Sequence, residues 1–103
     1  MVLIQKLEEA IEDEIHDVKH YAKWATELKK DYPSLAQVLF TISAQEDGHQ
    51  AMLHSEVVKI IENHRKTSGE PPAAMMAVYN YLHKRSIDKL AEARRYQEMY
   101  KNA

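Results

Sequence analysis

The stretch that decides the fold is residues 35–60, LAQVLFTISAQEDGHQAMLHSEVVKI. Apolar residues recur through it at a helical spacing, and Glu46 lies in the middle of the stripe that they form. The stripe consists of Leu35, Leu39, Ile42, Leu53, Val57 and Ile60. His49 follows one turn along the same face, so a carboxylate and an imidazole are directed toward an interior where ionisable groups are costly to bury.

An upstream stripe contains a second acid, Glu14. The residues that share its helical face are Leu3, Leu7, Ala10, Ile11, Val18, Tyr21, Ala25 and Leu28. We therefore expect the Glu14 carboxylate to point inward as well. Two carboxylates and an imidazole in one hydrophobic interior need partners, and a metal ion is the simplest single partner for all three.

Helical periodicity, interrupted at two breaks, predicts an all-α chain with a single domain. Pro33 suits the first turn of a helix, where its missing N–H costs nothing, and Asp31 or Tyr32 would be the cap residue. The Pro71-Pro72 pair cannot continue a helix and indicates a loop. We expect helices at about 3–30, 33–65 and 74–101, and a loop at 66–73.

The short first connection predicts that the first two helices pack as an antiparallel hairpin. Residues equidistant from the turn of such a hairpin lie at the same height. The midpoint between Glu14 and Glu46 falls in the break, as does the midpoint between Glu14 and His49. The sequence therefore predicts that the three side chains meet at one level, about 24 Å from the turn.

The third helix has a weaker apolar face and a basic charge. Its expected inner face is Met75, Val78, Tyr79, Leu82, Ala93, Tyr96 and Tyr100. Ser86 and Lys89 interrupt that face, and no second Glu-x-x-His occurs in it. Residues 73–103 carry about +3 and residues 1–31 about −3, so we expect the basic helix to lie against the acidic one or to face water. The excess is too small, and lacks the motifs, to indicate nucleic-acid binding.

Composition excludes several kinds of chemistry. The chain has no cysteine, which removes disulfides, thiolate zinc sites and iron–sulfur clusters, so any metal must be held by oxygen and nitrogen. No stretch approaches the roughly 18 apolar residues of a membrane span. The N-terminal residues lack the pattern of a secretory signal, and we expect a cytoplasmic protein with no membrane partner.

Two parts of the sequence carry a family resemblance: Glu14 with Tyr21 seven residues on, and the run Ala44-Gln45-Glu46-Asp47-Gly48-His49-Gln50-Ala51. Together they resemble the ferritin-like di-iron carboxylate proteins. The resemblance is strongest to a rubrerythrin-type half-bundle. That family builds its site from a Glu on one helix of each hairpin and a Glu-x-x-His on the other. The resemblance covers residues 3 to about 62, so the chain supplies one hairpin of a ferritin-like four-helix bundle.

The resemblance implies a role for each residue. Glu14 would be a terminal ligand, Glu46 a bridging ligand and His49 the nitrogen ligand. Because one chain supplies half a site, a homodimer or higher oligomer would complete it around two iron ions, as in encapsulated ferritins, which look similar in this respect. Manganese or zinc could also occupy such a site. Dioxygen or peroxide would be the small-molecule substrate of a ferroxidase or a peroxide-reducing enzyme.

Plainer interpretations stay open. Glu14 could lie at the edge of the buried face with its carboxylate in water, and Glu-x-x-His arises by chance in many helices. Tyr21 could donate a hydrogen bond or an electron to the site, or only fill the core. A metal-free scaffold or interaction dimer and a structural zinc-binding bundle are therefore alternative functions. His54 and His64 are expected to be core-edge or capping groups.

Overall fold

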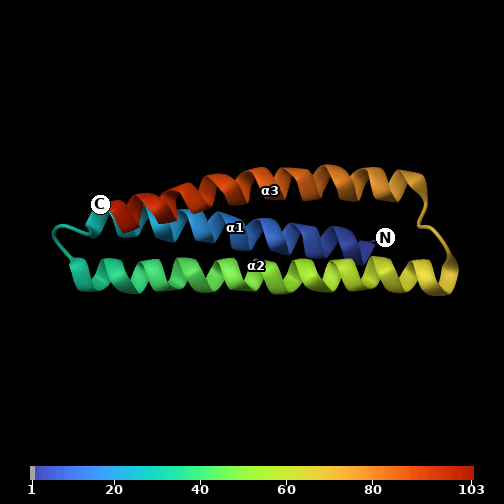
Figure 1. The fold of residues 1–103 in the computed structure, drawn as a ribbon, viewed down its shortest axis with the longest axis horizontal. Helices are drawn as coiled ribbons and strands as arrows, with labels where there is room; N and C mark the ends of the chain where they lie inside the picture. The colour runs from blue at the N-terminus through green and yellow to red at the C-terminus, as the bar shows by residue number, and fades with distance from the viewer. Residues whose placement is uncertain (1) are drawn as a thin grey trace.

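The computed structural model describes residues 2–103, and within that range the chain forms three long helices and no strand (Figure 1). The helices are α1 (Val2–Leu28), α2 (Pro33–Ser68) and α3 (Ala73–Asn102). Together they make a rod with extents of 56 × 19 × 18 Å. The predicted all-α fold, a long antiparallel hairpin followed by a third helix, is confirmed. None of the helices in the described part of the chain has the length and apolar composition of a membrane span.

The turn between α1 and α2 begins earlier than predicted. α1 ends at Leu28, and Lys29 and Lys30 belong to the turn. Lys29 turns toward the far end of the chain, where its ammonium donates a hydrogen bond to the carbonyl of Tyr100 and lies 4.4 Å from the centre of that ring. The lysine therefore caps the C-terminus of α3 rather than that of α1. Tyr32 occupies the N-cap position of α2, directly before Pro33.

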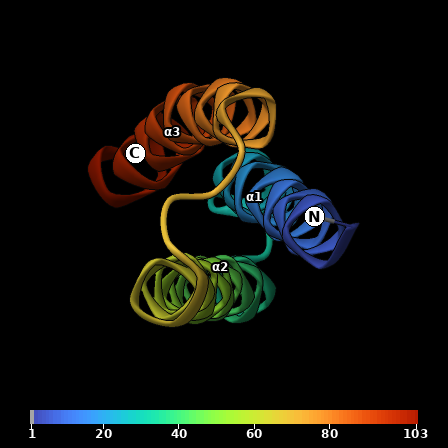
Figure 2. The ribbon, with the colours of Figure 1, turned by 90° about the vertical axis from the view of Figure 1, so that its right-hand side faces the viewer.

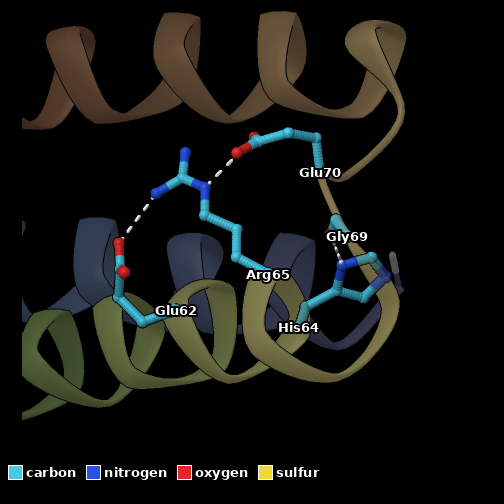
Figure 3. Close-up of polar contacts among 5 residues, drawn as sticks. All are labelled: Glu62, His64, Arg65, Gly69 and Glu70. Atoms are coloured by element: carbon cyan, nitrogen blue, oxygen red, sulfur yellow. Dashed lines mark hydrogen bonds and ion pairs between the residues drawn. The ribbon is translucent and has the colours of Figure 1, made fainter.

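α2 continues past its predicted end because polar side chains hold its last turn (Figure 3). Arg65 donates hydrogen bonds to Glu62 at 2.7 Å and to Glu70 at 3.2 Å. The Nδ1 atom of His64 lies 3.0 Å from the carbonyl oxygen of Gly69, whose φ of 82° ends the helix. His64 is thus a capping group, one of the two roles expected for it.

α1 packs against both other helices, while α2 and α3 have few contacts with each other. The end view in Figure 2 shows α2 and α3 apart, with α1 to one side of the space between them. A groove therefore runs between α2 and α3, and its floor is formed by α1 residues that include Ile11 and Ile15. The molecule therefore has two distinct faces. One is the open groove between α2 and α3, and the other is the outer face of the α1–α2 hairpin.

The core sets the spacing of the helices. Its larger cluster consists of Ile4, Ile11, Ile15, Val18, Val57, Ile61 and Ala93. Nearer the first turn the buried residues are small, including Ala22, Ala25 and Ala36, which lets the backbones approach closely. Buried Ser43 donates a hydrogen bond to the Val18 carbonyl at 2.7 Å and so fixes α2 against α1 at mid-length.

Ion pairs bring the basic third helix against the acidic first one. Lys19 of α1 pairs with Glu92 of α3 at 2.8 Å, and Arg85 and Lys89 of α3 both contact Glu12. Burial alone would raise the pKa of Glu12, but the hydrogen bond from Arg85 and the charge of Lys89 outweigh it and hold that pKa below its usual value. The basic helix was expected either to lie against the acidic one or to face water, and in the structure it lies against the acidic one.

The predicted inner face of α3 is wrong at one end. Val78 is 53% exposed, whereas Ser86, expected to interrupt the face, is buried. The reason is that α3 packs on α1 with little contact to α2, so its buried strip is narrower than that of a helix enclosed on two sides. Ser86, Ala93 and Tyr100 are the buried residues of this helix.

Candidate metal centre

Glu14 of α1 meets Glu46 and His49 of α2 on the outer face of the hairpin. The Nδ1 atom of His49 lies 3.6 Å from Oε2 of Glu14 and 3.8 Å from Oε2 of Glu46. One ligand atom from each residue lies within 4.8 Å of the other two, the spacing of a group that could hold a metal ion. The structure therefore brings together the three residues that the hairpin geometry placed at one height.

The cluster sits at the rim of the helix interface and not deep inside it. The exposed fractions of the side chains are 28% for Glu14, 20% for Glu46 and 54% for His49. The expected inward direction is thus only partly realised, because the cluster lies on the side of α1 away from α3. Glu12, two positions before Glu14 and so on the other side of the helix, is the residue that contacts α3.

Donor chemistry and burial fit a divalent transition metal. Oε2 of Glu14 is buried and has no hydrogen-bond partner within residues 2–103, although an unpaired buried carboxylate oxygen is costly. It faces an imidazole nitrogen and a second carboxylate, and this oxygen and nitrogen set suits iron, manganese or zinc. A cation held among these three groups would supply the partner that the protein itself does not.

Apolar residues continue the face on both sides of the cluster. Leu7 and Tyr21 lie seven residues before and after Glu14, and Leu53 lies seven residues after Glu46, so each shares a helical face with its ligand candidate. All three are half-buried. Leu3 and Leu35, further along the same faces, are 51% and 46% exposed. The outer face of the hairpin is therefore an apolar stripe with the charged cluster at its centre.

Asp47 is a structural neighbour of the cluster that the sequence alone did not reveal. Arg94 of α3 donates two hydrogen bonds of 3.0 Å to its carboxylate, and Gln50 donates a third, also of 3.0 Å. Burial alone would raise the pKa of Asp47, but these hydrogen bonds and the arginine charge outweigh it and lower that pKa. The bridge fixes α3 to α2 beside Glu46, and no local pattern could indicate a pair so distant in the sequence.

Tyr21 remains a prediction as a residue that acts on the centre. It is half-buried and packs beside His20 and Trp24, with ring centres 5.6 and 6.5 Å away. Its heptad position puts it on the face of Glu14, but none of the hydrogen bonds found within residues 2–103 joins the two side chains. Core packing accounts for its position without a role in chemistry.

A helical hairpin that carries carboxylates and a Glu-x-x-His imidazole at one level is the feature that defines the class of ferritin-like metal proteins. The family model described as Rubrerythrin matches residues 5–103, and the chain belongs to that family. The match includes α3, well beyond the region 3–62 in which residues alone carried the resemblance. No curated protein and no solved structure matches the chain. The family and the cluster together support a ferritin-like metal-binding role, with iron as the metal that the family suggests.

Proposed function

We propose that the chain is one subunit of a homodimeric di-iron protein in which each copy contributes Glu14, Glu46 and His49. The observation that carries the proposal is the buried Oε2 of Glu14, which has no hydrogen-bond partner within residues 2–103 and lies beside a carboxylate and an imidazole. Three ligands are too few for two metal ions. A two-fold axis beside the cluster would double the set to about four carboxylates and two imidazoles, enough for two metals.

The apolar stripe supports pairing on this face. Leu3 and Leu35 expose about half of their side chains there, and the half-buried Leu7, Tyr21 and Leu53 continue the stripe. Burial of these groups against a second copy would contribute roughly 25 cal/mol per Å² of apolar surface. The same contact would remove the cluster from water and strengthen its attraction for a cation.

The residues of each chain would have distinct tasks in this assembly. The carboxylates of Glu14 and Glu46 would offset the charge of the metals, and His49 would bind through a neutral ring nitrogen, the form of imidazole that ligates metals. Iron held by Glu14, Glu46 and His49 of both copies would supply redox chemistry, namely the two electrons that reduce a peroxide, with two protons, to two waters. The protein contributes ligand geometry and exclusion of bulk water, and a separate reductant would have to restore Fe(II).

The test of binding combines subunit mass with metal content. Protein from iron-supplemented culture should run as a dimer by light scattering and contain about one iron per chain by elemental analysis. Glu46→Ala should lose that iron. Glu56→Ala is the matched control, because Glu56 lies on the same helix, is exposed and contacts only Lys59 among the salt bridges found in residues 2–103. A metal-free monomer would contradict the proposal, a metal-free dimer would favour the scaffold alternative, and zinc in place of iron would favour a structural site.

The test of chemistry is oxidation of added Fe(II). With peroxide or air, the wild-type protein should develop Fe(III) absorbance faster than Glu46→Ala at equal concentration. Equal rates in the two proteins would show that the centre binds metal without catalysing its oxidation. The binding test is independent of this result, so the two parts of the proposal stand or fall separately.

A further inference from the structure

A second acid of α1, Glu8, is buried without a partner. Its side chain is 1% exposed, and neither carboxylate oxygen has a hydrogen-bond partner in the part of the chain that the structure describes. Burial raises the pKa of Glu8, and the negative charge of nearby Glu12 raises it further. A carboxyl group in this position destabilises the fold unless something pairs with it. The rim cluster does not use it, because Glu14 lies on another face of the helix.

Glu8 lines a pocket of about 320 Å³ in the groove between α2 and α3. His54 of α2 and His83 of α3 line the same pocket, so each helix contributes one side chain that can bind a metal. Ser86 also lines it, and its buried hydroxyl has no hydrogen-bond partner within residues 2–103. The remaining lining residues are Ile11, Ile15, Gln50, Ala51, Ile87 and Leu90. The pocket is thus apolar with a few unsatisfied polar groups in its wall.

The two imidazoles lie face to face across the groove. The ring centres of His54 and His83 are 4.7 Å apart with planes within 8° of parallel, and Tyr79 stacks on His83 at 5.5 Å. Burial lowers the pKa of His83, and His54 lowers it further, which keeps the His83 ring neutral and its lone pair free at neutral pH. Burial raises the pKa of Tyr79, and Glu8 adds to that rise, so its hydroxyl stays protonated.

We propose that Glu8, His54 and His83 bind one divalent transition-metal ion in the α2–α3 groove, separate from the Glu14 cluster. Two imidazoles and one carboxylate form a donor set for ions such as Zn²⁺ and Co²⁺. In the structure the rings stack on each other, and the donor atoms of the three residues do not lie as close together as those of the rim cluster, so the side chains would have to turn toward a common ion on binding it. The pocket that these three side chains line has a volume of about 320 Å³.

The placement gives the ion a structural consequence. α2 and α3 are the helices with least mutual contact, and Arg94 with Asp47 is one of the few links between them. An ion held by one residue from each helix would clamp α3 onto α2 and close the groove. Its binding would therefore raise Tm and slow amide exchange along α3, readouts that do not depend on oxidation chemistry or on dimer formation.

The experiment separates this site from the rim cluster and from surface histidines. The background variant carries Glu14→Ala, Glu46→Ala and His49→Ala, with His16→Ala and His20→Ala to remove the exposed pair on α1. Titration with Co²⁺, followed by visible absorbance and calorimetry, should show about one ion per chain in this background. Adding His83→Ala should weaken binding at least 10-fold, and Glu8→Gln should do the same. His64→Ala, which removes an imidazole outside the pocket, should leave it unchanged.

Two results would overturn the proposal. The first is a background variant that folds but binds no Co²⁺, and the second is binding that His83→Ala does not weaken. If the combined variant does not fold, the wild-type chain is compared with His83→Ala alone. Zn²⁺ should raise Tm and protect α3 more in wild type, whereas equal effects in both would sink the idea. Loss of iron in Glu46→Ala bears only on the proposed function, since that variant keeps Glu8, His54 and His83.

Discussion

The rim cluster and the groove pocket each combine a carboxylate of α1 with imidazole from another helix, yet they differ in readiness. At the rim, Glu14 already lies 3.6 Å from His49. In the groove, Glu8 is buried and has no hydrogen-bond partner among the residues that the structure describes, and His54 and His83 stack on each other. A short turn fixes α1 against α2, whereas α3 packs mainly on α1 and reaches α2 through side-chain contacts such as Arg94 with Asp47. The rim residues, on two helices joined by a short turn, therefore already lie close together. The groove residues include one from the more distant α3, and a bound ion would have to draw them together.

The largest expected effect is on iron affinity at the rim. His49→Ala removes the nitrogen ligand, and we expect Fe(II) affinity to fall by more than about 100-fold, beyond the loss typical of residues that only support a ligand. The matched control is His20→Ala, an exposed imidazole of α1. Anaerobic competition with a chromogenic chelator measures both. Glu8→Gln should change rim affinity by less than about threefold, and a comparable loss in that variant would show that the two regions are not independent.

Removal of the Glu8 carboxyl from the groove should raise the stability of the metal-free protein. Glu8→Met replaces an unpartnered buried carboxyl with an apolar side chain of similar shape, and we expect unfolding free energy at pH 7 to rise by about 2 kcal/mol. Glu14→Met should change it less, because Glu14 is partly exposed at the rim. Urea unfolding with chelator present measures both. Destabilisation by Glu8→Met would mean that the carboxyl has a partner in the folded protein.

The effect of Glu8 should also depend on pH. Its pKa in the folded chain is raised above the ordinary 4.5 by burial and by Glu12. The stability that Glu8 gives relative to Glu8→Gln is therefore complete below 4.5 and is lost as pH rises through the raised pKa. The groups that face it are Glu12, His54, His83 and Tyr79, and they are the same in both proteins.

Paired unfolding curves from pH 4 to 8 measure this difference. The stability of the wild type relative to Glu8→Gln should fall steadily as pH rises across this range. Glu9→Gln is the control for the chemical change itself, since Glu9 is the exposed neighbour and does not line the pocket. A wild type that gains stability over Glu8→Gln as pH rises would reverse the sign and refute the burial argument.

The sequence predicted the rim cluster and missed the groove for physical reasons. Helical periodicity and a short turn determine the relative height of residues in a hairpin, so Glu14, Glu46 and His49 could be placed together without tertiary information. Glu8 carries no such signal. Its burial depends on how α3 docks, and the sequence shows only an acidic residue beside other acidic residues.

Errors at a helix end and on a helix face also involve contacts between distant segments. α1 ends at Leu28, and the Lys29 side chain that follows it contacts Tyr100 at the far end of the chain, which no local pattern indicates. Val78 was expected to be buried but is exposed, because α3 packs on α1 and has little contact with α2. Local patterns thus identified the helices, while contacts between distant segments decided which faces they bury.

The smallest expected effect concerns Gly48, which lies between Glu46 and His49 in the interior of α2. A methyl group added there would meet no atom within 4 Å in the single chain. Gly48→Ala should therefore raise unfolding free energy by about 0.5 to 1 kcal/mol through reduced backbone entropy of the unfolded state. Iron affinity should be unchanged, because both ligands keep their positions. Urea unfolding and light scattering of wild type and variant test this. A variant that is less stable and less dimeric would show that Gly48 lies against the second subunit. The contact surface of the rim would then extend beyond its apolar stripe.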